Sequence, residues 1–146
     1  MQIETAAREA GVHDFIMGLP EGYQTRLGNG GNAVSGGQAQ KIAIARALVR
    51  RKAVLILDEC TSNLDSESAN EVHESIARLT KAEGGGRRMT IILITHSREM
   101  MMCAERIVVM SRGTVVESGS FLELSEAKGE LRRLLSRGEL LNRGSE

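Results

Sequence analysis

The chain has 146 residues, and its 19 basic and 19 acidic side chains give a formal net charge of zero. A neutral chain has no general attraction for nucleic acid or an anionic membrane, and two cysteines are too few for a disulfide scaffold. No apolar run approaches the ~20 residues of a membrane-spanning helix. Apolar residues make up 41 % and aromatic residues 2 %, so we expect one domain with a mainly aliphatic core.

The N-terminal stretch has the apolar spacing of short helices. Residues 2–10 place an isoleucine and three alanines on one face, and Gly11 ends this helix. Residues 13–17 predict a second short helix, with His13 as a surface residue. Residues 19–23 predict a turn, and residues 28–32 form a glycine-rich loop.

A turn at residues 35–38 begins the next helix, which we expect over residues 37–50. Ser35 can cap it, and Gly36 and Gly37 leave room for another group to approach the backbone. A helix N-terminus suits a phosphate, although an ordinary capped helix start explains the same residues. The predicted buried face of this helix consists of Ile42, Ala45 and Val49, and the basic residues, including Lys41 and Arg46, are expected on a solvated face.

Residues 54–57 are all apolar and predict a strand buried on both faces, as in a parallel sheet. Asp58 and Glu59 follow at its carboxyl end, where open α/β sheets bind ligands. Asp58 is placed to hold Mg²⁺ through water, and Glu59 is placed to orient or deprotonate an attacking water. The alternative is an acidic turn after a core strand.

A turn at residues 62–65 leads into a helix that Asp65 or Ser66 can cap. Apolar residues recur at helical spacing on this helix, and His73 lies off their face, where we expect it to be solvated. Residues 84–88 predict a glycine-rich helix end and linker. The apolar residues are Ala69, Val72, Ile76 and Leu79.

The strand expected over residues 91–95 would bring His96 to the same sheet edge as Glu59. An imidazole there can hydrogen-bond a γ-phosphate, or it can cap a turn. Three methionines at residues 100–102 fall in the helix that follows, where we expect them to fill the core. A hairpin comes next, with strands at residues 107–110 and 114–117. Two amphipathic helical segments finish the chain, with apolar anchors at Leu122, Leu124, Leu131, Leu134 and Leu135.

Four of these motifs together resemble the ATP-binding cassette (ABC) ATPases. Residues 34–38 resemble the signature loop of that family, with Val34 in place of the usual leucine. Residues 55–59 resemble its Walker B strand, and residues 62–65 resemble its D-loop, with Asn63 in place of alanine. His96 resembles its switch histidine. The resemblance extends from about residue 4 to about residue 135.

The resemblance implies the C-terminal half of a nucleotide-binding domain. The implied fold is α/β: a partial P-loop NTPase (RecA-like) parallel sheet with part of the ABC helical subdomain. Residues 1–52 would belong to the helical subdomain, residues 53–128 to the catalytic α/β subdomain, and residues 129–146 to a C-terminal helix and tail. The implied cofactors are ATP and Mg²⁺.

In this family two nucleotide-binding domains enclose two ATP molecules between them. By resemblance, the signature residues would serve the partner's ATP, and Asp65 would link the two sites. Glu59 and His96 would be catalytic at this domain's own ATP, with Asp58 at the metal. The implied signature contacts are Ser35, Gly36, Gly37 and Gln38.

Residues 19–25 match a stretch that precedes the signature loop in ABC exporters, whereas Asn29 and Gly30 depart from the exporter pattern. The resemblance thus implies an exporter of a peptide or hydrophobic compound. Its partners would be a second nucleotide-binding domain and transmembrane domains, with no nucleic acid. The domain would lie at the cytoplasmic face of a membrane.

No G-x-x-x-x-G-K-[ST] sequence occurs in the chain. That Walker A loop supplies most of the direct contact with a triphosphate, so we expect the chain alone to be inactive as an ATPase. Two alternatives stay open. One is a soluble ABC protein of translation or DNA repair, and the other is a non-catalytic fragment that at most binds a partner.

Overall fold

The computed structural model describes residues 2–27, 34–81 and 89–142, and it describes side chains up to residue 136 except that of Lys81. The chain forms two compact units, residues 1–95 and residues 96–146. The glycine-rich loop expected at residues 28–32 and the linker expected at residues 84–88 lie outside the described ranges.

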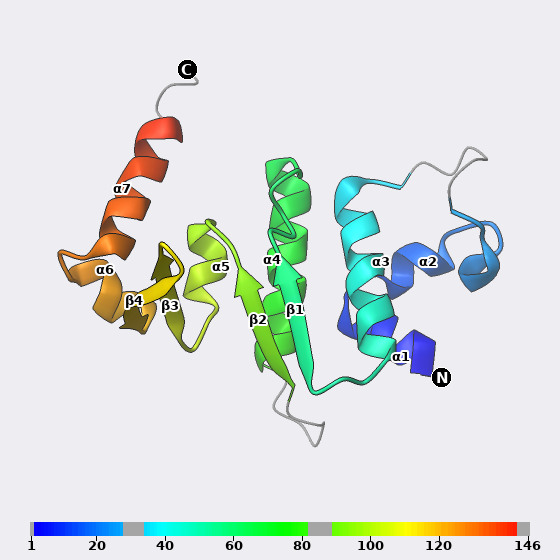
Figure 1. The fold of residues 1–146 in the computed structure, drawn as a ribbon. Helices are drawn as coiled ribbons and strands as arrows, with labels where there is room; N and C mark the ends of the chain where they lie inside the picture. The colour runs from blue at the N-terminus through cyan, green and yellow to red at the C-terminus, as the bar shows by residue number, and fades with distance from the viewer. Residues whose placement is uncertain (1, 28–33, 82–88, 143–146) are drawn as a thin grey trace. The chain divides into compact units, whose positions relative to one another are not determined.

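The first unit combines helices with a parallel strand pair (Figure 1). Its elements begin and end within about two residues of the predicted ones, so the predicted pattern of helices and strands is confirmed. In chain order they are α1 (Gln2–Glu9), α2 (His13–Met17), the 3₁₀ turn η1 (Gly22–Gln24), α3 (Gly36–Val49), β1 (Val54–Asp58), α4 (Ser66–Lys81) and β2 (Thr90–Ile94).

The helical core lies where α1, α3 and α4 pack together. On α3 the expected face is only partly right, because Ile44 and Leu48 are buried while Ile42 and Val49 are half-buried. The helix packs against both α1 and α4, so its buried face is wider than that of a helix that packs against a single neighbour. The other buried apolar residues of the three helices include Ala6, Ala7, Ala45, Val72 and Ile76.

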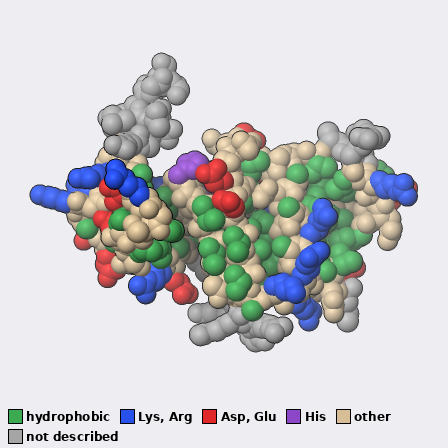
Figure 2. All heavy atoms as spheres, viewed as in Figure 1, with side chains coloured by type: hydrophobic (Ala, Val, Ile, Leu, Met, Phe, Trp, Pro, Cys, Tyr) green, Lys and Arg blue, Asp and Glu red, His purple; other side chains and the backbone are tan. Residues whose placement is uncertain are grey.

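Strands β1 and β2 pair in parallel, with Val54 opposite Thr90 and Asp58 opposite Ile94. The parallel sheet is as predicted, but burial on both faces is not found. Leu55 and Leu57 are buried, whereas Ile56 is 61 % exposed. Figure 2 shows hydrophobic side chains gathered over these strands on one face. Ile92 and Ile94 on β2 are also 45 % and 50 % exposed, so one face of this strand pair is left uncovered.

The second unit is a hairpin with helices. Its elements are α5 (Arg98–Met102), β3 (Ile107–Ser111), β4 (Thr114–Gly119), α6 (Phe121–Glu126) and α7 (Glu130–Asn142). The strands pair antiparallel, and Arg112 and Gly113 both have positive φ, as a two-residue hairpin turn requires. This confirms the predicted hairpin.

The core of the second unit is smaller than the leucine pattern suggests. Val109, Leu124 and Leu131 form it, whereas the expected anchor Leu122 is 66 % exposed and Leu134 is 46 % exposed. The methionine-rich helix contributes to this core only in part: Met101 packs against it half-buried, and Met102 is exposed. Helices α5 and α6 are short and bury one residue each, Met100 and Leu124, which leaves Met102 and Leu122 exposed.

The carboxylate of Glu117 on β4 anchors the start of α7. It accepts hydrogen bonds from the backbone N–H groups of Glu130 at 2.6 Å and Leu131 at 3.0 Å. A carboxylate at a helix N-terminus satisfies free donors and suits the helix dipole. Across the described part of the chain, no helix is both long and apolar enough to cross a membrane.

Candidate functional site

Ser35 caps α3 in the way that the sequence predicts. Its Oγ accepts a hydrogen bond from the Gln38 N–H at 3.2 Å, and the Gln38 Oε1 accepts one from the Ser35 N–H at 3.0 Å. This reciprocal capping box fixes the turn. Within the described ranges, the N–H groups of Gly36 and Gly37 have no acceptor. The turn therefore presents two free donors at the positive end of a 14-residue helix.

The two glycines of the turn also have a packing role, which the sequence alone does not reveal. A Cβ on Gly37 would lie 3.0 Å from the Ser68 Cβ and 3.2 Å from the Ser68 backbone. A Cβ on Gly36 would lie 2.6 Å from Cδ2 of Leu64. The absence of side chains here lets α3 approach α4 and the turn that precedes it.

Asp58 and Glu59 lie at the carboxyl end of β1, both exposed. Glu59 has a left-handed backbone with φ of 43°, which is uncommon for a residue with a Cβ. Its N–H donates to the Ile94 carbonyl at 2.8 Å, and its carbonyl accepts from the Ser62 N–H at 3.1 Å and from the Ser62 Oγ at 3.0 Å. These bonds hold the backbone of Glu59 at the sheet edge, a constraint that no residue pattern predicts.

Asp65, rather than Ser66, supplies the side-chain cap of α4. Its Oδ1 accepts a hydrogen bond from the Ser68 N–H at 3.0 Å. Hydrogen bonds from the Ser68 backbone and side chain lower the pKa of Asp65. Ser68 also packs against Gly37, so one buried serine touches both the signature turn and the D-loop cap.

His96 is exposed and follows β2 by two residues. It is the first residue of the second unit, whereas Glu59 belongs to the first. Their expected meeting at one edge stays a prediction.

The residues described by the structure include no cluster of three or more His, Cys, Asp and Glu side chains that could enclose a metal ion. Mg²⁺ needs no such cluster, since it keeps several waters and uses one or two carboxylates with substrate phosphates. An exposed Asp58 at the sheet edge fits that kind of site.

Two expectations about single side chains are wrong. Lys41 was expected on a solvated face, but its side chain is 12 % exposed, and its Nζ pairs with Oε2 of Glu71 at 2.7 Å. His73 was expected to be solvated, but both ring nitrogens are buried without a hydrogen-bond partner among the described residues. No local pattern marks Lys41, because the packing of α3 on α4 that buries its face is itself a tertiary contact.

The first part of the chain matches a known protein family. The ABC transporter family model matches residues 2–62, which include the signature turn and the β1 strand with its two carboxylates. Together with the relatives that match nearly the whole chain, this shows that the chain belongs to the ATP-binding cassette family. The predicted family is thereby confirmed, together with the α/β fold of a partial ABC domain.

Three curated relatives each match 91 % of this chain. Multidrug resistance protein pgp-1 of Caenorhabditis elegans is 47 % identical. The ATP-dependent lipid A-core flippase of Syntrophus aciditrophicus is 46 % identical, and the cyclolysin secretion/processing ATP-binding protein CyaB of Bordetella pertussis is 48 % identical. The chain spans 10 %, 21 % and 18 % of their respective lengths.

Proposed function

We propose that this chain forms the C-terminal part of the ATP-binding and ATP-hydrolysing domain of an ABC exporter. The observation that carries the proposal is the pair of exposed carboxylates, Asp58 and Glu59, at the carboxyl end of a parallel strand pair. Ligands of open α/β sheets bind at that end. The names of the relatives, which include a multidrug resistance protein and a flippase, support an export function.

The turn at the start of α3 would bind the ATP held mainly by a second nucleotide-binding domain. The free N–H groups of Gly36 and Gly37 suit phosphate oxygens. Ser35 and Gln38 would shape the turn through the capping box that they form and add polar atoms beside it. Asp65, at the start of α4, would link this site to the other.

The carboxylates would act on ATP held by this domain. Asp58 would hold Mg²⁺ through its water ligands, and the bound ion would neutralise charge on the phosphate oxygens. Glu59 would accept a proton from the attacking water. Its hydrogen-bonded backbone limits how far the carboxylate can move. His96 would donate a hydrogen bond to the terminal phosphate.

The working form would be a head-to-tail pair of nucleotide-binding domains attached to transmembrane domains. Residues 1–52 would then belong to the helical subdomain, residues 53–128 to the catalytic subdomain, and residues 129–146 to the C-terminal helix and tail. The domain would lie at the cytoplasmic face of the membrane. The names of the relatives, which include a multidrug resistance protein and a flippase, support a role in membrane transport.

The test is Glu59→Gln in the full-length protein that contains this chain. Because general-base catalysis supplies roughly 10²-fold or more, ATP hydrolysis should fall by that factor while ATP binding is kept. Glu67→Gln is the control, since Glu67 is an exposed carboxylate in the first turn of α4. This variant should hydrolyse ATP at the rate of the parent. Hydrolysis by Glu59→Gln within a few-fold of the parent would overturn the role of Glu59.

A further inference from the structure

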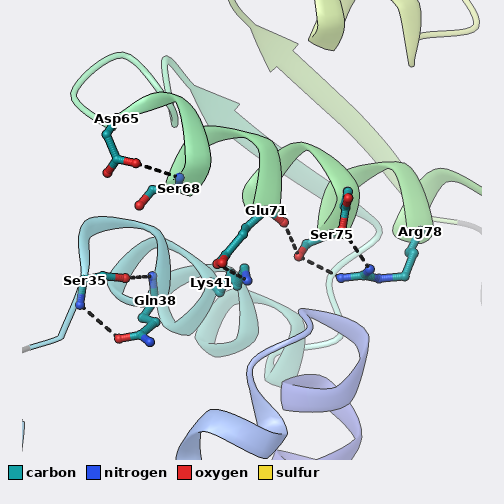
Figure 3. A network of polar contacts seen from close by, with 9 residues as sticks. Ser35, Gln38, Lys41, Asp65, Ser68, Glu71, Ser75 and Arg78 are labelled. Atoms are coloured by element: carbon teal, nitrogen blue, oxygen red, sulfur yellow. Dashed lines mark hydrogen bonds and ion pairs between the residues drawn. The ribbon is translucent and has the colours of Figure 1, made fainter.

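Helices α3 and α4 are joined by two different contacts along one seam (Figure 3). Near their N-termini, Gly37 packs directly on Ser68. One turn further along α3, the Lys41 ammonium pairs with the Glu71 carboxylate at 2.7 Å. The first contact brings the helices close together, and the second joins them by charge.

The Lys41–Glu71 ion pair differs from a second pair that the structure describes on α4, Arg78–Glu74. The Lys41 side chain is 12 % exposed, and the Glu71 side chain is 48 % exposed. By contrast, Arg78 and Glu74 are 3.9 Å apart, and their side chains are 55 % and 75 % exposed. An exposed pair contributes little, whereas a partly buried ammonium that loses its partner keeps an uncompensated charge. The Lys41–Glu71 pair therefore favours one alignment of the two helices.

That alignment determines where two motifs lie relative to each other. The signature turn is the start of α3, and Asp65 is the cap of α4. Ser68 lies between them, since it packs on Gly37 and donates its N–H to Asp65. Sliding of α3 along α4 would move the free N–H groups of the turn away from Asp65, and the ion pair opposes that sliding.

We propose that Lys41 and Glu71 are positioning residues, whose ion pair holds the signature turn in register with the Asp65 cap for contact with ATP. This inference rests on the proposed function, because it assumes that the turn contacts a nucleotide. It adds a role for two side chains that lie outside the four motifs. Neither side chain is required to touch ATP itself.

The experiment compares Glu71→Gln and Lys41→Met with the parent in the full-length protein. The turn would reach ATP only when two domains close, so a displaced turn weakens the closed state. We expect KM for ATP to rise roughly two- to thirtyfold, the range for residues that act from outside a ligand site, with a smaller change in kcat. The charge-swapped variant Lys41→Glu with Glu71→Lys should restore KM. Glu74→Gln, on the same helix, is the matched control and should leave KM unchanged.

Three results would overturn the proposal. The first is an unchanged KM in both single variants. The second is a raised KM in Lys41→Met that the charge swap does not restore, because Lys41 would then act without Glu71. The third is a lower melting temperature with KM unchanged, which would mark the pair as purely structural.

A separate readout distinguishes failure of this inference from failure of the proposed function. Amide hydrogen exchange over residues 36–41 does not depend on hydrolysis. Glu71→Gln should speed exchange there, and Glu74→Gln should not. If the parent hydrolyses no ATP, the proposed function fails and the exchange result still decides whether the ion pair positions the turn.

Discussion

Arg51 and Glu59 share an unusual backbone, with φ of 47° and 43°. The side chain of Glu59 has a proposed catalytic role. Replacing Glu59 with glycine would relieve the backbone strain but would remove the carboxylate. Arg51 follows α3, where its N–H donates to the Leu48 carbonyl. Its exposed side chain has no such role, so the strain there can be relieved by substitution.

Arg51→Gly should therefore stabilise the fold. A left-handed residue with a Cβ costs about 1–2 kcal/mol, and glycine loses part of that gain through its larger entropy in the unfolded chain. The expected net gain is ~0.5–1 kcal/mol, measured by denaturant unfolding of a completed domain, in which this chain follows an N-terminal half that carries a Walker A loop. Arg50→Gly is the control. Arg50 has φ of −72°, so glycine relieves no strain there and its larger entropy in the unfolded chain should make this variant less stable than the parent. Equal effects of both changes would contradict the argument.

The Asp65 cap should make the start of α4 sensitive to acid. Because hydrogen bonds from Ser68 lower the pKa of Asp65 in the folded state, the cap stabilises the fold above the unfolded pKa of ~3.9. That contribution is lost as pH falls through the lower folded pKa. In the completed domain, the Ser68 amide signal in NMR should titrate with a midpoint below ~3.9, and Asp65→Asn should abolish this titration. A midpoint above that value would refute the cap.

At the scale of the element, the close approach of α3 and α4 depends on Gly37. Gly37→Ala should destabilise the completed domain by about 1–2 kcal/mol, since its Cβ would meet the Ser68 backbone and overpacking has a cost of this order. Gly36→Ala is the matched control, because its Cβ would meet only the end of the Leu64 side chain. It should stay within about 0.5 kcal/mol of the parent. Chemical denaturation measures both, and equal losses would argue against a backbone contact.

At the scale of the whole molecule, the exposed face of the parallel sheet is the main feature. Val54, Ile56, Ile92 and Ile94 are 45–61 % exposed on β1 and β2. Exposed apolar strands with unpaired edges promote aggregation. The printed sequence also contains no Walker A loop, so the chain by itself offers little direct contact to a triphosphate.

The 146-residue chain alone should therefore melt weakly or without cooperativity, and Mg-ATP should not raise its melting temperature. The total stability of a domain is only ~5–15 kcal/mol, so the loss of cover over one sheet face can remove most of it. Calorimetry with and without Mg-ATP measures this, and the completed domain should show both a cooperative transition and an upward shift. A sharp transition of the chain alone that rises with Mg-ATP would place the phosphate site elsewhere.

Much of the local structure follows from the sequence itself. The helices and strands come from apolar spacing, and the Ser35 cap comes from a hydroxyl at a helix start, because both depend on residues a few positions apart. The parallel pairing of β1 and β2 also agrees with their apolar runs. The family follows from four motifs in order, since each motif is a short local pattern.

Only the tertiary structure decided what depends on distant residues. The contact of Gly37 with Ser68 and the burial of Lys41 against Glu71 join residues about thirty positions apart, so no local periodicity encodes them. The left-handed Glu59 depends on a hydrogen bond to Ile94 from another strand. The exposed face of β1 could not be read from residues 54–57, because the same apolar run serves a strand covered on one face or on both, and the neighbouring elements decide which.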